Sequence, residues 1–331
     1  MKKLMNKASA FVDEALDGLV QANPSLVRDG ENGRVVRRAQ GIRKGKVGIA
    51  SGGGSGHLPL FTGYVGHGLL DTCSIGNVFE GPTVGSCIDA LRLADGGRGV
   101  LRLYGNYGGD RMNFDMAGEM LEDEIRCTTV LGTDDIASAP QEESTKRRGV
   151  AGIIYAYKIA GAKAELGADL DAVTGLAART VAATRTIGVA LKSCQLPGAE
   201  KPTFVIGDDE IELGMGIHGE PGIWRDRLRS ADEIVDEMLD RLLAETPEAA
   251  GSQVSILVNG LGATPIEELF ILYRRASSRL VAEGFEIVQP LVGNYVTSLE
   301  MAGASISLCF LDNEMKSLLA EPAFCPFWRV S

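Results

Sequence analysis

The sequence has few of the residues from which metal sites and disulfide frameworks are built. Only three histidines occur in 331 residues, which excludes a histidine-rich metal site. The cysteines include no C-x-x-C pair, and scattered thiols in a chain of this size are typical of reduced, mostly buried side chains. They are Cys73, Cys87, Cys127, Cys194, Cys309 and Cys325. We therefore expect no metal on this chain.

Long hydrophobic runs and an excess of basic residues are also lacking. No segment approaches the roughly eighteen apolar residues of a membrane helix. The opening MKKLMNK imitates a signal peptide, but the acidic amphipathic stretch ASAFVDEALDGLV follows it. The formal net charge of −11 disfavours nucleic acid and anionic membranes as partners. We expect a soluble, cytoplasmic protein that binds neither.

What is present is enough apolar sequence for a core, in an alternating pattern. Hydrophobic residues make up 45% of the chain, and its length fits one large or two ordinary domains. Strand-like runs at 46–50, 99–105 and 126–132 alternate with loops and helices, which predicts an α/β fold. We expect helices at 151–166 and 170–194, then a crossover at CQLPGAEKP (194–202). Later runs continue the pattern, including a helix at 231–245 with Ile234, Met238, Leu239 and Leu242 on one face.

The glycine-rich stretch SGGGSGH (51–57) directly follows a predicted strand, so it raises the question of nucleotide binding. A Walker loop needs lysine after its last glycine, and a dinucleotide fingerprint begun at Gly52 needs glycine at 57. His57 occupies that position and defeats both motifs. The glycines still allow either close backbone approach to a small ligand or a tight structural turn.

Two other stretches carry candidate site residues. Asp110, in YGNYGGDRMNF, lies between a strand and a helix, where ligands of α/β folds gather, although capping the helix is the alternative. His218, in GMGIHGEPGIW, lies on a glycine-rich turn and is either available for chemistry or simply exposed. His67 has no comparable surroundings, and we interpret it as structural.

Two charged runs are ambiguous. Asp134 and Asp135 are adjacent carboxylates that point in different directions, so capping of the next helix is favoured over a metal site. Lys146 and Arg148, in STKRRG, fit either a phosphate contact or a solvated helix start.

Together these stretches resemble the dihydroxyacetone-binding subunit of the dihydroxyacetone kinases over nearly the whole chain. The shared blocks, in the family's order, are GGGSGH, GYVG, NYGGDRMNF, VLGTDD, KSCQLPG, GIHGEPG and VGNYVTSLEMAGASISL. The resemblance implies two α/β domains with mixed sheets flanked by helices and an active site between them. We predict domains at 1–190 and 191–315, with about 316–331 packing back on the first.

The family's chemistry implies a role for each candidate residue. Its members bind the ketone as a covalent hemiaminal on the histidine of G-I-H-G-E-P-G, which is His218 here. His57 and Asp110 would flank the substrate hydroxyls, and the backbone at Gly54 and Ser55 would bind substrate in the room left by the glycines. Asp110 is suited to act as general base and His57 to hydrogen-bond or relay the proton. An imidazole nitrogen adds to a ketone but not to an alcohol, which selects against glycerol.

The resemblance also implies partners. Mg-ADP or Mg-ATP would lie on a separate helical subunit, with no cofactor on this chain, and the subunit would be a homodimer. The expected activity is that of a phosphotransferase with an alcohol acceptor. The rivals are a ketone-sensing coactivator and a ketone-binding protein with no kinase role. Asp110 beside both histidines favours the enzyme, because a sensor needs no base.

One stretch departs from the family. Many members have H-E-P-A-H-A-G-Y-V-G where this chain has HLPLFTGYVG, so Leu58 replaces a carboxylate and Phe61 replaces a histidine. The change reflects either repacking under the glycine stretch or altered substrate choice, with a four-carbon ketose such as erythrulose as the substrate.

Overall fold

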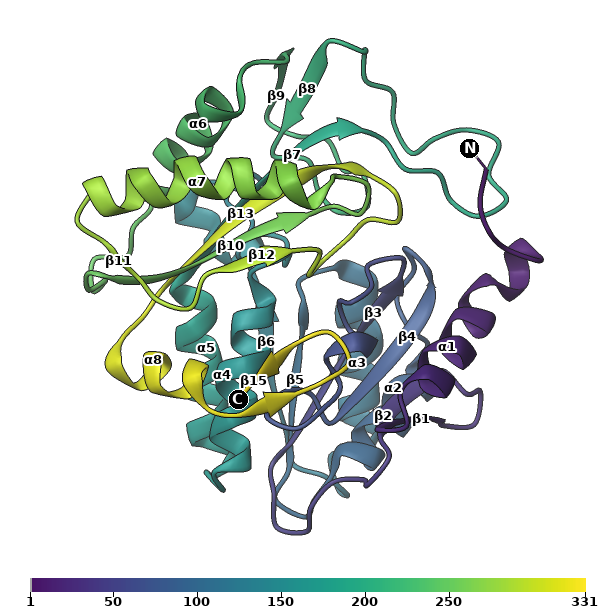
Figure 1. Cartoon of the computed structure of the whole chain (residues 1–331). Coiled ribbons are helices and arrows are strands. Elements are labelled where there is room, and N and C mark those ends of the chain that lie inside the picture. Colours follow the sequence, from purple (N-terminus) through teal and green to yellow (C-terminus); the bar gives the residue numbers. More distant parts are fainter. Residues whose placement is uncertain (1) are drawn as a thin grey trace.

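The first half of the chain forms a six-stranded mixed sheet. A computed structural model describes residues 2–331 (Figure 1). The strand order is β1-β2-β4-β3-β5-β6. Neighbours among β4, β3, β5 and β6 pair in parallel, while β1 and β2 add to the β4 edge as antiparallel strands. The strands are β1 (Leu26–Asp29), β2 (Val35–Arg38), β3 (Gly48–Ser55), β4 (Thr72–Val78), β5 (Val100–Gly105) and β6 (Cys127–Gly132).

Helices cover both faces of this sheet, so each face has its own apolar core. On one face, α2 (Val84–Ala94) and α3 (Gly108–Met120) enclose buried side chains such as Leu91 and Phe114. The other core includes α4 (Ile153–Glu165), α5 (Leu170–Ala182) and residues of α1 (Phe11–Ala22). Short 3-10 helices lie at η1 (Ala8–Ala10), η2 (Thr62–Tyr64) and η3 (Gln141–Lys146).

A second mixed sheet follows, in the order β11-β10-β13-β7-β8-β9 with β12 also paired to β10. Its strands are β7 (Thr184–Lys192), β8 (Glu210–Leu213), β9 (Trp224–Arg227), β10 (Gln253–Gly260), β11 (Glu286–Ile287), β12 (Leu291–Gly293) and β13 (Ala302–Phe310). Helices α6 (Ala231–Ala244) and α7 (Ile266–Ala282) contribute to its core. The four residues predicted to share one face of α6 are all buried. The α/β class with mixed, helix-flanked sheets is therefore confirmed.

Three local predictions were wrong. The helix expected over 170–194 ends at Ala182, and 184–192 forms β7, because Thr184, Thr186 and Ile187 are β-branched and pair with β13. The glycine stretch is not a loop, since β3 continues to Ser55. It is followed by turns and η2 rather than by a regular helix. Helix α3 begins at Gly108, so Asp110 lies inside its first turn.

The chain crosses from one sheet to the other at Thr184, where β7 begins. A boundary at 190 would cut this strand. After β13 the chain returns to the first half through α8 (Asn313–Ala320), β14 (Ala323–Phe324) and β15 (Arg329–Val330) (Figure 1). Lys158 of α4 donates a hydrogen bond to the Leu318 carbonyl at 2.6 Å, which fastens α8 to α4.

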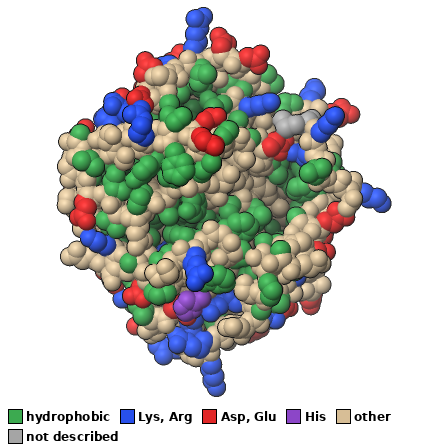
Figure 2. All heavy atoms as spheres, viewed as in Figure 1, with side chains coloured by type: hydrophobic (Ala, Val, Ile, Leu, Met, Phe, Trp, Pro, Cys, Tyr) green, Lys and Arg blue, Asp and Glu red, His purple; other side chains and the backbone are tan. Residues whose placement is uncertain are grey.

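Hydrophobic and charged side chains are unevenly distributed over the surface of the molecule seen in Figure 2. On the face in Figure 2, hydrophobic side chains gather toward the middle and charged side chains lie mainly around the edge. Of the helices within residues 2–331, none is long and apolar enough to span a bilayer.

Candidate active site

The two sheets bring His57 and His218 together, although 161 positions separate them in the sequence. Their ring centroids lie 4.8 Å apart, edge to face. His57 follows the end of β3 in the first sheet, and His218 lies in the turn between β8 and β9 of the second. The ring of Phe79 stacks on His57 at 4.8 Å and meets His218 edge-on at 5.3 Å. The two predicted histidines thus lie together where the two sheets meet.

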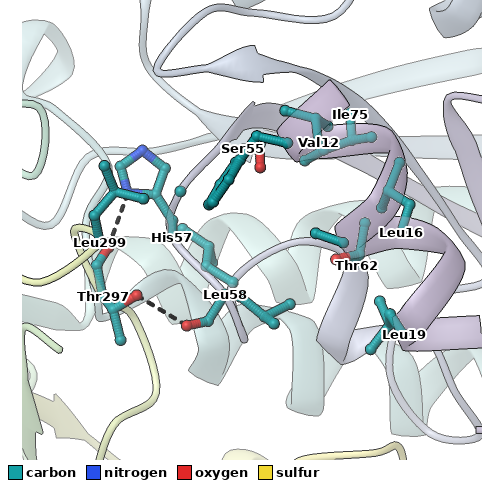
Figure 3. A pocket seen from close by; sticks show the side chains of 14 residues that line it. Val12, Leu16, Leu19, Ser55, His57, Leu58, Thr62, Ile75, Thr297 and Leu299 are labelled. Carbon is teal, nitrogen blue, oxygen red and sulfur yellow. Dashed lines mark hydrogen bonds between the residues drawn. The ribbon is translucent and has the colours of Figure 1, made fainter. Parts of the chain in front are cut away.

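His57 is buried with one ring nitrogen unsatisfied. Its Nδ1 lies 2.8 Å from the Thr297 carbonyl, and Thr297 in turn donates to the Leu58 carbonyl (Figure 3). A carbonyl only accepts, so Nδ1 carries the proton and Nε2 has a free lone pair. Nε2 is buried without a hydrogen-bond partner among residues 2–331. Burial lowers the pKa of His57 to about 3, and neighbouring His218 adds to the shift. The ring is therefore a neutral acceptor at physiological pH.

Asp110 is a buried carboxyl that does not cap its helix. The N-cap of α3 is Tyr107, which forms no side-chain cap bond, so the capping alternative for Asp110 is wrong. Its Oδ1 is buried and finds no partner in the described part of the chain. Burial raises the pKa of Asp110 to about 7, and His218 only partly offsets this rise. A carboxyl with this pKa can exchange a proton near neutrality, as a general base must.

His218 has a carboxylate partner. Its Nδ1 lies 2.9 Å from Glu220 Oε1, and its backbone N–H donates to Glu220 Oε2 at 3.0 Å. Burial opposes ionisation of Glu220, but the hydrogen bond and charge of His218, with a contribution from Arg148, lower its pKa to about 2. The carboxylate holds the proton on Nδ1 and leaves the Nε2 lone pair available for addition to a carbonyl. Glu220 was missed in the sequence, although its place two residues after His218 was visible.

The glycines accommodate the protein's own chain. A Cβ on Gly53 would collide with the Phe61 ring, and one on Gly54 would lie 2.8 Å from the Glu80 nitrogen. These two glycines therefore have a packing role, and the expectation that the stretch leaves room for substrate stays a prediction. The Ser55 carbonyl accepts from the Phe79 N–H at 3.0 Å, which holds Phe79 over His57.

Leu58 and Phe61 face different surroundings. Phe61 is buried, with its ring 6.4 Å from that of His57. Leu58 is 44% exposed and lines a half-open apolar cavity of about 260 Å³ beneath α1, bordered by Val12, Leu16 and Leu19 (Figure 3). Of these two replacements, Phe61 is therefore the one whose side chain forms a ring contact with His57.

The other singled-out residues lie outside this cluster or support it. His67 is half-exposed, 3.5 Å from Glu165. Asp134 accepts from the N–H groups of Val150 and Gly152, which precede α4, so the capping interpretation stays a prediction. Asp135 instead pairs with Arg148, and Lys146 pairs with Glu143. Within residues 2–331, no group of three or more histidine, cysteine or acidic side chains is arranged to hold a metal ion.

Comparison with known proteins gives consistent matches. The family model described as the Dak1 domain matches residues 17–327. The chain is 45% identical to the dihydroxyacetone-binding subunit DhaK of PTS-dependent dihydroxyacetone kinase 2 from Listeria innocua, with all of both chains covered. It is 42% identical to L-erythrulose 1-kinase of Mycolicibacterium smegmatis, covering 99% of this chain and 58% of that protein. The crystal structure of the dihydroxyacetone kinase of C. freundii superposes with a TM-score of 0.91 at 32% identity, over 99% of this chain and 60% of that one.

Proposed function

The chain belongs to the Dak1 domain family, which includes dihydroxyacetone-binding subunits of dihydroxyacetone kinases, and we propose that it binds a short ketose covalently on His218. The subunit then presents a primary hydroxyl of the ketose for phosphorylation. The observation that supports this most directly is an oriented imidazole, His218, in ring contact with His57 and close enough to influence the charge of Asp110, where His57 Nε2 and Asp110 Oδ1 are buried without a partner in residues 2–331. Buried unpartnered atoms are rare in proteins, and here they supply an acceptor and a base for a bound polyhydroxy ketone.

Covalent binding begins with His218. Its Nε2 lone pair adds to the carbonyl carbon, the C=O π electrons move to the oxygen, and that oxygen takes a proton to become a hydroxyl. The imidazole becomes positively charged, and the Glu220 carboxylate, 2.9 Å from Nδ1, stabilises this charge. Release of the Nδ1 proton to water balances the proton that the oxygen takes up. Glycerol has no carbonyl and cannot follow this route.

Phosphoryl transfer uses Asp110. The hydroxyl oxygen attacks the terminal phosphorus of the donor while its proton passes to the Asp110 carboxylate, and the donor leaves with the bonding electron pair. His57 Nε2 accepts a hydrogen bond from a substrate hydroxyl and holds it for attack. Fixing both reactants in this way reduces the entropic part of the barrier.

The donor belongs to a partner in this proposal. Mg-ADP or Mg-ATP is carried by a helical nucleotide-binding subunit; the name of the Listeria relative identifies that protein as the dihydroxyacetone-binding subunit of a PTS-dependent kinase. The similar identities to a dihydroxyacetone kinase subunit and an erythrulose kinase leave both ketoses as candidate substrates. We also propose that the protein is cytoplasmic and forms a homodimer. Light scattering of the purified chain tests the dimer through its molar mass. The coactivator alternative is less well supported, because it leaves the buried, unpartnered Asp110 without a use.

Crystals soaked with dihydroxyacetone test the proposal. We expect continuous electron density from His218 Nε2 to the C2 carbon, with one hydroxyl near Asp110 and His57. A ketone bound without a bond to His218 would exclude the covalent step. A ketone bound elsewhere would contradict the proposed site.

A further inference from the structure

Asp135 and Arg148 are two charged residues of the first half that take no part in the chemistry above. They are nevertheless connected to His218, because Arg148 lies near Glu220, which binds the His218 ring. We infer that Arg148, held in place by Asp135, is a positioning residue that fixes Glu220 and thereby the orientation and tautomer of His218. This inference rests on the proposed function, because it concerns the nucleophile of that site.

Asp135 anchors Arg148 firmly. The Nε and Nη2 atoms of Arg148 lie 2.9 and 2.8 Å from Asp135 Oδ2. The Asp135 N–H also donates to the Arg148 carbonyl at 3.1 Å. The side chains of Arg148 and Asp135 are 14% and 4% exposed, so water competes little for this pair. Both residues belong to the segment that joins β6 to α4 in the first half.

From this anchor, Arg148 reaches into the second half. Its Nη2 donates to the Gly214 carbonyl at 3.2 Å, and its Nη1 lies 3.8 Å from Glu220 Oε2. Gly216 lies against both side chains, because a Cβ there would collide with Glu220 Oε2 and Arg148 Nη1. A glycine at 216 is therefore required for the arginine and the carboxylate to approach each other.

Glu220 transmits this placement to His218. Its two oxygens bind the Nδ1 and the backbone N–H of His218, so a shift of the carboxylate moves the ring and releases the Nδ1 proton. The segment between β6 and α4 also supports the His218 ring from another side, through Tyr107. Tyr107 donates to the Gly149 carbonyl at 3.1 Å and packs edge-on against His218 at 4.8 Å. The nucleophile of the second sheet is thus aligned by residues of the first.

The neighbouring residue provides a matched control. Arg147 is also buried and also bridges the two halves, because its Nη1 and Nη2 bind Glu245 at 2.6 and 2.8 Å. Glu245 follows α6, and Arg147 makes no recorded contact with Glu220 or His218 among residues 2–331. Both adjacent arginines therefore reach the second half, Arg147 through close contacts to Glu245 and Arg148 through Gly214 and Glu220, and only Arg148 lies on the route to His218.

The test compares Arg148→Met, Arg148→Lys and Arg147→Met in the full chain by ¹⁵N NMR of labelled histidine. Only three histidines are present, and His218→Ala assigns the signal. Wild type and Arg147→Met should show a single His218 form with its proton on Nδ1. Arg148→Met should give a mixture of ring forms, and Arg148→Lys should restore part of the single form because it returns the positive charge.

A second measurement follows loss of the carbonyl signal of 2-¹³C-dihydroxyacetone. Adduct formation should slow by up to about 10²-fold in Arg148→Met, in line with the cost of a misplaced reacting group. An unchanged tautomer and rate in Arg148→Met would overturn the inference, as would equal losses in Arg147→Met. If wild type formed no adduct, the covalent proposal would fail, while the ¹⁵N comparison would still decide the role of Arg148.

Discussion

The two sheets contribute unlike halves to one site. The first supplies His57 and Asp110, each buried with a polar atom that has no partner in residues 2–331. The second supplies His218, whose Nδ1 and backbone N–H are both bound by Glu220. Leaving buried polar atoms unpaired is costly, so a polar ligand that paired with both atoms would remove this cost. The second half is already prepared, with a single imidazole nitrogen free to react.

The largest expected effect comes from removing the prepared nucleophile. His218→Ala should abolish the covalent adduct, because it removes the imidazole whose Nδ1 is bound by the Glu220 carboxylate, which would stabilise the charge formed on addition. Crystals of the variant soaked with dihydroxyacetone provide the measurement, which is electron density for a covalent bond to the ketone. His67→Ala is the control, since His67 is half-exposed beside Glu165, and it should retain the adduct. An adduct that persisted in His218→Ala would reverse the roles assigned to the two halves.

The next effect separates binding from turnover. Asp110→Asn is nearly isosteric but cannot accept the hydroxyl proton, so phosphorylation with the partner subunit should fall by about 10²–10⁴-fold. The ketone adduct should remain, because His218 is untouched. Asp115→Asn, on the same helix but half-exposed, should keep normal turnover. Near wild-type turnover by Asp110→Asn would show that Asp110 is not the general base.

A smaller effect concerns which ketose fits between the halves. If Leu58 and Phe61 alter the choice of substrate, kcat/KM should be about 10–200-fold higher for erythrulose than for dihydroxyacetone. Phe61→His should reduce this preference, because Phe61 packs beside His57. Leu58→Glu should change it little, because Leu58 lines the cavity beneath α1. Equal preference for the triose before and after both changes would favour simple repacking.

The smallest effect is on stability. Asp110 has a pKa of about 7 when folded against an ordinary aspartate value of 3.8, so the folded state holds the extra proton between these values. Its stabilising contribution is present below about pH 4 and is lost as the pH rises through 7. Asp110→Asn should therefore raise the melting temperature by a few degrees at pH 8 relative to its effect at pH 4. Calorimetry at both pH values measures this, and a difference of the opposite sign would contradict the buried, ionisable Asp110.

Much of the fold and the main site residues could be predicted from local sequence. The alternation of strand-like and helix-like runs identified the α/β class, and the apolar spacing of α6 identified its buried face. Local patterns failed at 184–192, because neither glycine- nor proline-rich sequence separates this segment from the alanine-rich end of the preceding helix. Pairing with β13 and β8, which lie elsewhere in the sequence, makes it a strand.

The sequence by itself determined that His57, Asp110 and His218 stand in motifs suited to a ketose kinase subunit, since residue type and spacing are written locally. Only the tertiary structure decided what surrounds them. The Thr297 carbonyl that fixes the His57 tautomer lies 240 positions away, and Arg148 reaches Glu220 from the other half of the molecule. The pKa values near 3 and 7 likewise arise from burial. Burial and long-range contacts exist only once the chain has folded, because they depend on which distant segments come together.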